Sequence, residues 1–155
     1  MDQLDQQILH LLAKDSAIET TEISRTVNLS VPSVNKRIAK LKREGVITSF
    51  TVLTDAEKVD KSVTAFILVV LQYAEGVDAF LEYVQNDPDI LECYAISGGY
   101  DYMIKACAKD IKHLEQKLLR IKGQRGVTKS QTMISLMEHK CKPTVLPTLE
   151  EKNEQ

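Results

Sequence analysis

EISRTVNLSVPSVNKRIAKLKREG, residues 22–45, is a stretch that predicts two helices joined by a tight turn. The first helix ends at Asn28, a residue type that tolerates the left-handed conformation in which helices often close. Ser30 is placed to cap the second helix, and Pro32 lies in its first turn, where a missing amide donor costs little. Gly45 follows as a helix stop. Residues 4–14 have apolar side chains at helical spacing, so the first 45 residues predict three helices in a helix-turn-helix arrangement.

The pattern changes after Gly45. Residues 46–54 are rich in β-branched and aromatic types, which predicts extended chain, a wing or a linker strand. The polar residues 55–62 mark the region of a domain boundary. Beyond it, strands are predicted over residues 64–72, 90–96, 102–108 and 127–137, and helices over residues 77–85 and 112–121. The order βαββαβ is that of a ferredoxin-like domain.

The predicted fold class is therefore α+β, with an N-terminal winged helix-turn-helix and a C-terminal ferredoxin-like βαββαβ domain. Residues 1–50 form the winged helix-turn-helix domain in this prediction, and residues 51–61 form a linker strand or hinge. Residues 62–142 form the ferredoxin-like domain, and residues 143–155 form a C-terminal tail.

The first strand of the second domain has apolar side chains on both faces. The two alternating sets are Phe66, Leu68 and Val70 on one face and Ala65, Ile67, Val69 and Leu71 on the other. A layer of two helices covers only one face of a sheet. The other face is apolar as well and must also be buried, and a second copy of the sheet can bury it. The sequence predicts a homodimer and leaves open which set faces the partner.

Composition excludes several protein classes. Of the 155 residues, 43% are hydrophobic and 27% are charged, as in ordinary globular proteins. The longest apolar run, residues 65–71, is much shorter than the roughly 20 residues that cross a bilayer, and no signal sequence is apparent, so a cytoplasmic protein without membrane contact is expected. Cys93, Cys107 and Cys141 lack C-x-x-C spacing, which fits a reducing compartment. His139 and Cys141 form an H-x-C pair without further ligands at metal-site spacing, so no metal or cofactor is predicted.

Basic residues are concentrated on the third helix, although the formal net charge of the chain is -2. Residues 31–43 contain five lysines and arginines and no acid. In helix-turn-helix proteins this helix lies in the major groove, with its first residues on base edges and flanking basic residues on phosphates. Ser33 and Lys36 are the first candidates for base edges, Asn35 and Arg37 are the next, and Arg25, Lys40 and Arg43 are candidates for phosphate contacts. The alternative, lysines that serve only solubility, is disfavoured by their position in a three-helix unit.

Four stretches resemble the Lrp/AsnC, or feast/famine, family of regulators. They are LDQQILHLLAKD (4–15), EISRTVNLS (22–30), RIAKLKREGVI (37–47) and SGGYDY (97–102). The resemblance extends in order along the chain to about Met137. It implies a DNA-binding transcriptional regulator whose partners are double-stranded DNA, further copies of itself and a small-molecule effector. Residues 1–50 would then be the DNA-binding domain, and residues 62–142 would be the regulatory domain for oligomerisation and effector binding. Dimers that assemble into tetramers or octamers, with an amino acid bound between dimers, are the implied assembly.

The effector loop of that family reads G-D-aromatic-D-hydrophobic, and residues 98–102 here read GGYDY, so Gly99 replaces the first acid. The residues that the resemblance implies for effector binding are Gly98, Gly99, Tyr100, Asp101, Tyr102, Leu119, Met133, Ile134 and Ser135. A zwitterion needs amide donors, an acid and apolar walls, which the glycines, Asp101 and Met133 with Ile134 could supply. The alternative is a glycine hairpin in which Asp101 only satisfies local donors.

Three other functions remain as alternatives: an effector-independent DNA-organising protein, a ligand buffer without DNA, and a haem-pathway enzyme similar to the sirohaem decarboxylases. His10, His113 and His139 lie on different predicted segments, without a nucleophile or paired carboxylate at mechanistic spacing. No catalytic residue is therefore predicted.

Overall fold

The structure is a computed structural model, which describes residues 1–72 and 76–149. The chain divides into two compact units. The first contains Met1–Leu53 and the C-terminal segment from Lys140, and the second contains Thr54–His139. The last six residues of the predicted tail, 150–155, lie outside the described residues.

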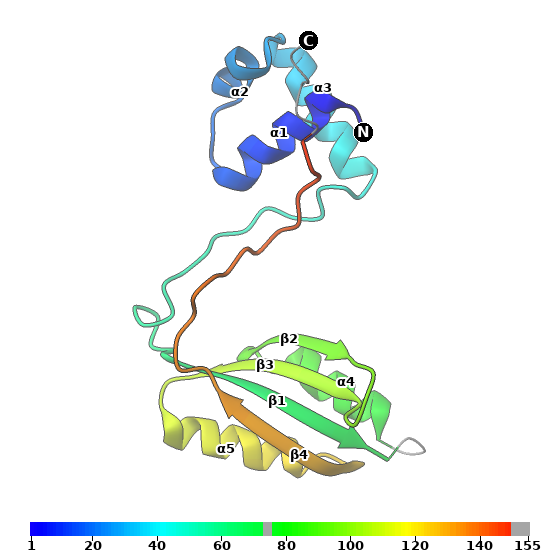
Figure 1. Cartoon of the computed structure of the whole chain (residues 1–155), viewed down its shortest axis with the longest axis vertical. Helices are drawn as coiled ribbons and strands as arrows, with labels where there is room; N and C mark the ends of the chain where they lie inside the picture. The colour runs from blue at the N-terminus through cyan, green and yellow to red at the C-terminus, as the bar shows by residue number, and fades with distance from the viewer. Residues whose placement is uncertain (73–75, 150–155) are drawn as a thin grey trace. The chain divides into compact units, whose positions relative to one another are not determined.

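Three helices form the first unit: α1 (Gln3–Lys14), α2 (Thr20–Val27) and α3 (Val31–Arg43) (Figure 1). The predicted turn between α2 and α3 is confirmed, since Asn28 has the left-handed φ of 54°. Ser30 caps α3 as predicted, because its side chain accepts a hydrogen bond from the Ser33 amide. The buried side chains Ile8, Ile23, Val27 and Val34 form the core that fixes the three helices together.

The segment after α3 has no regular secondary structure. The amides of Val46 and Ile47 both donate to the carbonyl of Leu41, which closes the C-terminal end of α3. Between α3 and the next element the structure contains no strand, and all of residues 44–62 are described. Of the three alternatives predicted for residues 46–54, the structure shows the extended chain without a paired wing.

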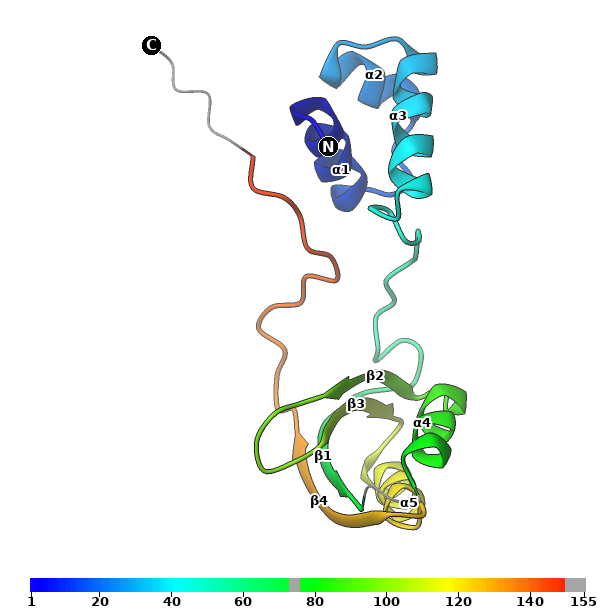
Figure 2. The same cartoon turned by 90° about the vertical axis from the view of Figure 1, so that its right-hand side faces the viewer.

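The second unit is a four-stranded antiparallel sheet with two helices. Its elements are β1 (Val63–Leu71), α4 (Val77–Asn86), β2 (Ile90–Ala95), β3 (Tyr102–Ala108), α5 (Ile111–Lys122) and β4 (Val127–Ile134). The strands lie in the order β2-β3-β1-β4, which confirms the ferredoxin-like prediction. Both helices cover the same face of the curved sheet (Figure 2).

The helix layer decides which face of β1 is the core face. Ala65, Ile67 and Val69 are fully buried and pack with Phe80 of α4 and Ile121 of α5. The alternate β1 residues point to the other face and are only half-buried in one protomer. The structure thus shows a sheet with one covered face and one open face.

The final strand is shorter than predicted. Strand β4 ends at Ile134, whereas the sequence predicted a strand to Met137. The reason is the length of its neighbour: β1 begins at Val63, and the Ser135 amide makes the last contact with it, to the carbonyl of Thr64. Leu136 is 97% exposed, so the β propensity of the residues after Ile134 was not sufficient to form a strand without a partner strand. None of the described helices has the length and apolar character needed to span a bilayer.

Candidate nucleic-acid interface and effector loop

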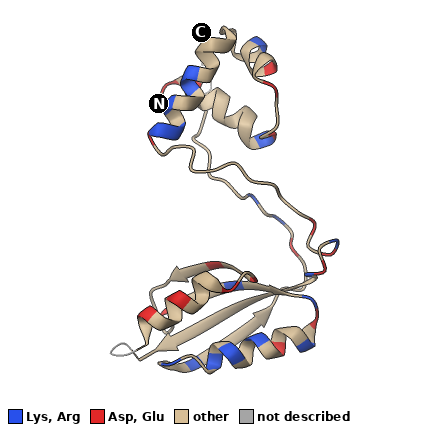
Figure 3. Cartoon of the chain, turned by 180° about the vertical axis from the view of Figure 1, so that it is seen from behind, with Lys and Arg blue, Asp and Glu red and all other residues tan. Residues whose placement is uncertain are grey.

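The outer face of α3 presents basic side chains to solvent. Asn35, Lys36 and Arg43 are exposed on α3, and Arg25 is exposed on α2. Figure 3 shows the basic residues of α3 in blue, and no acid lies within the helix. A surface of this kind can place amide, ammonium and guanidinium donors against the phosphates and base edges of a duplex.

Ser33 is closer to the turn than the other candidates. Its hydroxyl lies 2.8 Å from the Ser30 hydroxyl, and its amide donates to the same Ser30 oxygen at 3.4 Å. Ser33 is half-buried in this arrangement. The cap therefore fixes the side chain at the N-terminal end of α3, where base-edge contacts are expected.

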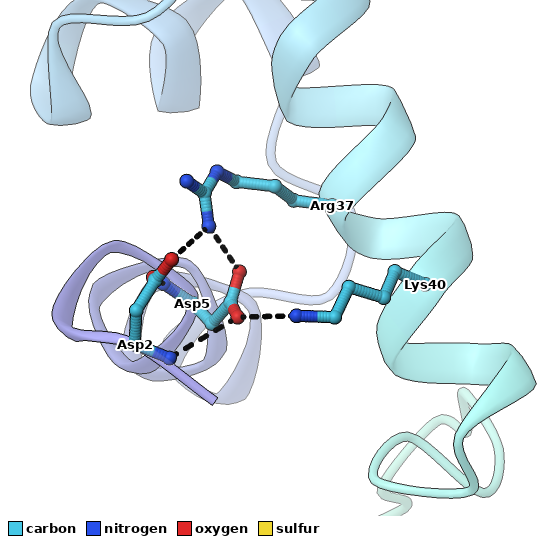
Figure 4. Close-up of polar contacts among 4 residues, drawn as sticks. All are labelled: Asp2, Asp5, Arg37 and Lys40. Atoms are coloured by element: carbon cyan, nitrogen blue, oxygen red, sulfur yellow. Dashed lines mark hydrogen bonds and ion pairs between the residues drawn. The ribbon is translucent and has the colours of Figure 1, made fainter.

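Arg37 is engaged with acidic residues of α1 (Figure 4). Its Nη1 donates to Asp2 Oδ2 at 2.7 Å and to Asp5 Oδ1 at 2.6 Å. Lys40 Nζ lies 3.4 Å from Asp5 Oδ2, and its side chain is 38% exposed. Asp5 itself is fully buried between α1 and α3. The acidic start of α1 thus holds the middle of α3 by charge-assisted hydrogen bonds.

The electrostatics follow from that geometry. The Arg37 side chain lowers the pKa of Asp2 from its ordinary value. Burial raises the pKa of Asp5, but the hydrogen bonds from Arg37 and the Asp2 amide outweigh burial, and the net shift is downward. The two carboxylates raise the pKa of Arg37 in turn. All three groups are charged at neutral pH, so they form a stable ionic cluster.

Sequence analysis did not identify Asp2 and Asp5 as partners of α3. The helix dipole alone favours acids near an N-terminus, so their position at the start of α1 does not indicate a partner. One signal was present: Asp5 lies three residues before Ile8 and seven before Leu12, in phase with the apolar stripe of α1. An acid in an apolar stripe is buried and needs a cationic partner.

The loop over residues 98–102 is fastened to β1 by Asp101. Its Oδ2 accepts a hydrogen bond from the Leu71 amide at 2.8 Å, and its own amide donates to the Val69 carbonyl at 2.9 Å. Gly98 has a φ of 118°, which favours glycine, whereas a Cβ at Gly99 would meet no atom within 4 Å. Asp101 thus satisfies a local donor, as in the hairpin alternative.

Tyr100 extends from the same loop onto the open face of the sheet. Its hydroxyl donates to Gln131 Oε1 at 2.7 Å, and Lys129 Nζ lies 4.8 Å from the centre of its ring. Both partners belong to β4, opposite Leu68 and Val70 of β1. Tyr102 instead faces the core, with its ring 5.5 Å from that of Phe80.

The remaining predicted effector residues lie elsewhere in the protomer. Tyr102 pairs with Val69, whereas Met133 and Ile134 pair with Phe66 and Ala65, about 10 Å further along β1 at ~3.3 Å per residue. Ser135 follows β4, and its amide bonds to Thr64. Leu119 is 63% exposed on α5, in the helix layer. One protomer therefore groups residues 98–102 but does not bring all nine residues together.

A cavity of about 740 Å³ lies beside α1 in the first unit. Its walls come from α1, from α2 and from the C-terminal segment over residues 141–149. His10 Nε2 lies 2.9 Å from the Pro147 carbonyl, which attaches that segment to α1. Within residues 1–72 and 76–149, no three groups of the metal-binding types come together.

The comparisons with known proteins agree with this architecture. Residues 1–48 match the model for winged helix-turn-helix DNA-binding domains, and residues 64–145 match that for Lrp/AsnC ligand binding domains. The HTH-type transcriptional regulator FL11 of Pyrococcus horikoshii is 35% identical over 150 residues, which cover 95% of this chain and 96% of that protein. The leucine-responsive regulatory protein of Escherichia coli is 32% identical over 147 residues, with coverage of 90% and 87%.

Solved structures give the same result. A transcriptional regulator of Neisseria meningitidis, determined as a complex with L-methionine, superposes with a TM-score of 0.88 at 28% identity. The superposition covers 94% of this chain and 96% of that chain. LrpC of Bacillus subtilis superposes with a TM-score of 0.82 at 29% identity, over 89% of this chain and 96% of that chain.

Proposed function

The chain belongs to the Lrp/AsnC family of transcriptional regulators, and on that premise we propose that it binds double-stranded DNA sequence-specifically through the outer face of α3. The observation that supports this proposal is the exposed, acid-free basic face of α3 directly after a capped turn. The helix has the position and charge that a recognition helix needs in the major groove.

We assign different roles to the two ends of this face. Ser33, Asn35 and Lys36, near the start of α3, contact base edges in this proposal. Arg43, Lys40 and Arg25 contact phosphates, where a cation adds affinity without sequence information. Arg37 differs because its Nη1 already bonds two carboxylates.

Selection of duplexes from a randomised DNA pool tests the proposal. We expect enrichment of one consensus sequence. The Lys36→Ala variant should discriminate between that duplex and a scrambled duplex at least tenfold less well than wild type, since a good base contact contributes ~1–3 kcal/mol. Lys122→Ala removes the same charge from an exposed position of α5 and serves as the matched control. An unenriched pool, or equal effects of the two variants, would contradict the proposal.

Assembly is the second part of the proposed function. We propose that the open sheet face pairs two protomers and that dimers assemble further into tetramers or octamers. The half-buried apolar residues of β1 on that face support this proposal. An effector site between dimers would also combine residues 98–102 of one protomer with Leu119, Met133, Ile134 and Ser135 of others.

The proposed effector is an amino acid. L-methionine is the first to test, because a 28% identical regulator was solved as a complex with it. Calorimetry with each of the twenty amino acids should show binding of at least one, and Gly99→Asp should strengthen it by supplying a second acid in open space. If none binds to either protein, the effector proposal fails.

A specific observation favours the effector-independent alternative. The Asp101 carboxylate accepts from the Leu71 amide, so its presence in the loop has a purely structural explanation. In this alternative the protein organises DNA at all amino-acid concentrations. DNA affinity that stays constant in the presence of every amino acid would support it.

We further propose that the chain is a regulator without catalytic activity. His10 contacts the Pro147 carbonyl and His113 contacts Asp110, so each of these rings has a structural partner. Because the proposed target is double-stranded DNA, we propose that it acts in the cytoplasm. Visible absorption of the purified protein tests the haem-enzyme alternative, for which a haem spectrum would be the supporting result.

A further inference from the structure

The cluster of Asp2, Asp5, Arg37 and Lys40 joins α1 and α3, two helices that also share the apolar core containing Ile8 and Val34. Arg37 lies at the middle of α3, and Asp5 is fully buried in the first turn of α1. The Asp2 and Asp5 side chains and amides also form a capping box, which fixes the start of α1. The orientation of the two carboxylates is therefore set before they meet Arg37.

Arg37 is fixed more firmly than its neighbours on α3. One nitrogen, Nη1, donates at 2.6 Å and 2.7 Å to two different carboxylates. The Arg37 side chain is 26% exposed, compared with 38% for Lys40. If Arg37 left these two short bonds for a DNA phosphate, the fully buried Asp5 would keep only the longer contacts to Lys40 and to the Asp2 amide, at 3.4 Å and 3.3 Å.

From this geometry we infer that Arg37 is a positioning residue: held by Asp2 and Asp5, it sets the orientation of α3 on α1 and contributes no phosphate contact. The inference rests on the proposed DNA-binding function and refines it. A helix held at its middle keeps its N-terminal half, with Ser33 and Lys36, at a fixed angle to the duplex. Arg37 then affects specificity through geometry, whereas Arg43 affects affinity through charge.

The salt dependence of DNA binding separates these two roles. Each phosphate contact contributes about 0.9 to the slope of log affinity against log salt concentration. Arg37→Met and Arg43→Met remove the same charge from the same helix and keep an unbranched side chain. For a bound dimer we expect Arg43→Met to make the slope shallower by about 1.8, and we expect Arg37→Met to leave the slope unchanged.

Specificity should respond in the opposite way. Arg37→Met should reduce discrimination between the selected and scrambled duplexes about tenfold or more, whereas Arg43→Met should weaken binding to both duplexes equally. Arg37→Lys retains a cation within reach of Asp5 and should restore part of the discrimination. A slope for Arg37→Met as shallow as that for Arg43→Met would overturn the inference.

A second measurement does not depend on DNA. Arg37→Met, Asp5→Asn and the double variant form a cycle, measured by urea unfolding of the full chain. Each single substitution changes the unfolding constant by some factor. If Arg37 is bound to Asp5, the factor for the double variant should differ about tenfold from the product of the two single factors. Additive effects would overturn the inference even if no duplex were selected, and failure of the selection alone would contradict only the proposed function.

Discussion

Asp101 has two roles to be separated, because its carboxylate bonds the Leu71 amide and is also the proposed partner of an effector ammonium. Asp101→Asn keeps an oxygen that can accept from the Leu71 amide, while it removes the charge. Asp101→Ala removes both the accepting oxygen and the charge, so the Leu71 amide loses this acceptor.

We expect Asp101→Ala to reduce the free energy of unfolding by about 1–3 kcal/mol and Asp101→Asn to have little effect on it. Asp101→Asn should nevertheless weaken amino-acid binding about tenfold, because a charge-assisted contact is lost. Urea unfolding and calorimetry of both variants provide the two measurements. Equal destabilisation by the two substitutions would show that the charge, and not the hydrogen bond, fastens the loop.

Lys117 of α5 is the most deeply buried cation described in the second unit, with a side chain 8% exposed. Its Nζ lies 2.6 Å and 2.7 Å from the two carboxylate oxygens of Asp87, which follows α4. Burial raises the pKa of Asp87, but the hydrogen bonds from Lys117 outweigh burial, so the net shift is downward. Burial and the nearby Asp87 charge raise the pKa of Tyr83 to about 12, so the tyrosine stays neutral as a donor to that carboxylate.

Lys117→Met should therefore destabilise the second unit in a pH-dependent way. It keeps the apolar stem but leaves Asp87 without its cation, a loss of about 3–5 kcal/mol at neutral pH. Because the folded pKa of Asp87 lies below the unfolded value, the contribution of the pair is complete above the unfolded value and disappears as the pH falls through the folded value. The difference in unfolding free energy between wild type and variant should shrink from pH 7 to pH 3. Lys112→Met, at an exposed position of α5, is the control.

Sequence analysis predicted the conformation or capping role of a residue correctly where that depends only on neighbours in the sequence. The left-handed Asn28 and the Ser30 cap depend on neighbours within a few positions, and both are confirmed. The bonds of Arg37 to Asp5 and of Lys117 to Asp87 join residues 32 and 30 positions apart. The phase of Asp5 with the apolar stripe of α1 indicates burial but does not indicate which cation it meets, so only the tertiary structure identifies the partners in both pairs.

At the scale of elements, α4 begins in close contact with the turn between α5 and β4. A Cβ on Gly76 would lie 2.3 Å from the Arg125 carbonyl oxygen, and Gly126 has a φ of 88° at the same place. The two glycines allow two backbones to approach more closely than side chains permit. Sequence analysis did not identify this contact, because glycine next to a helix start is also common in ordinary turns.

Gly76→Ala should therefore reduce the stability of the second unit, since the carbonyl that its methyl group meets belongs to backbone and cannot rotate away. We expect a loss of about 1–3 kcal/mol, as for other overpacking substitutions. Gly99→Ala introduces the same methyl group where no atom lies within 4 Å of it, and should change the unfolding midpoint little. The two midpoints in urea, measured together, test the contact. Similar midpoints would show that the turn adjusts.

The types of the nine helices and strands in the described residues were predicted correctly, but where each one ends depends on the elements it packs against. Helices with strong caps and periodic apolar residues, such as α1 and α3, were located within a few residues. Strand β4 was predicted three residues too long, because its pairing with β1 stops at Ile134 opposite Ala65, near the beginning of β1. The sequence could not decide whether residues 46–54 form a wing, since they have strand propensity but no described strand to pair with.

At the scale of the whole molecule, the chain after β4 returns to the first unit and lines the cavity beside α1. Removing residues 140–155 should destabilise the first unit, because His10 loses its bond to the Pro147 carbonyl and Leu11 is exposed. We expect faster amide hydrogen exchange in α1 of the truncated protein and unchanged exchange in β1 and β3. Unchanged protection of α1 would show that the segment contributes nothing to the stability of that unit.

The structure identifies which face of the sheet is open to a second copy, a point that the sequence prediction of a dimer left undecided. Sequence alone left two alternating sets on β1, and the structure assigns Val69 to the helix core, fully buried, and Leu68 to the open face. On that face Leu68 lies between Met103 of β3 and Gln131 of β4, in the middle of the sheet. A second copy would cover this apolar centre, and a charge placed there would be buried at the interface.

Leu68→Asp should therefore separate the protomers without unfolding them, because in the monomer the new carboxylate is solvated on the open face. Val69→Asp, one residue away, places the same charge in the core and should unfold the second unit. Light scattering after size exclusion should give a folded monomer for Leu68→Asp, with the far-ultraviolet circular dichroism of the wild type. A bound dimer occupies two half-sites, so the same variant should also bind the selected duplex much more weakly than wild type, although α3 is unchanged. A Leu68→Asp protein that remains dimeric would place the interface elsewhere on the molecule.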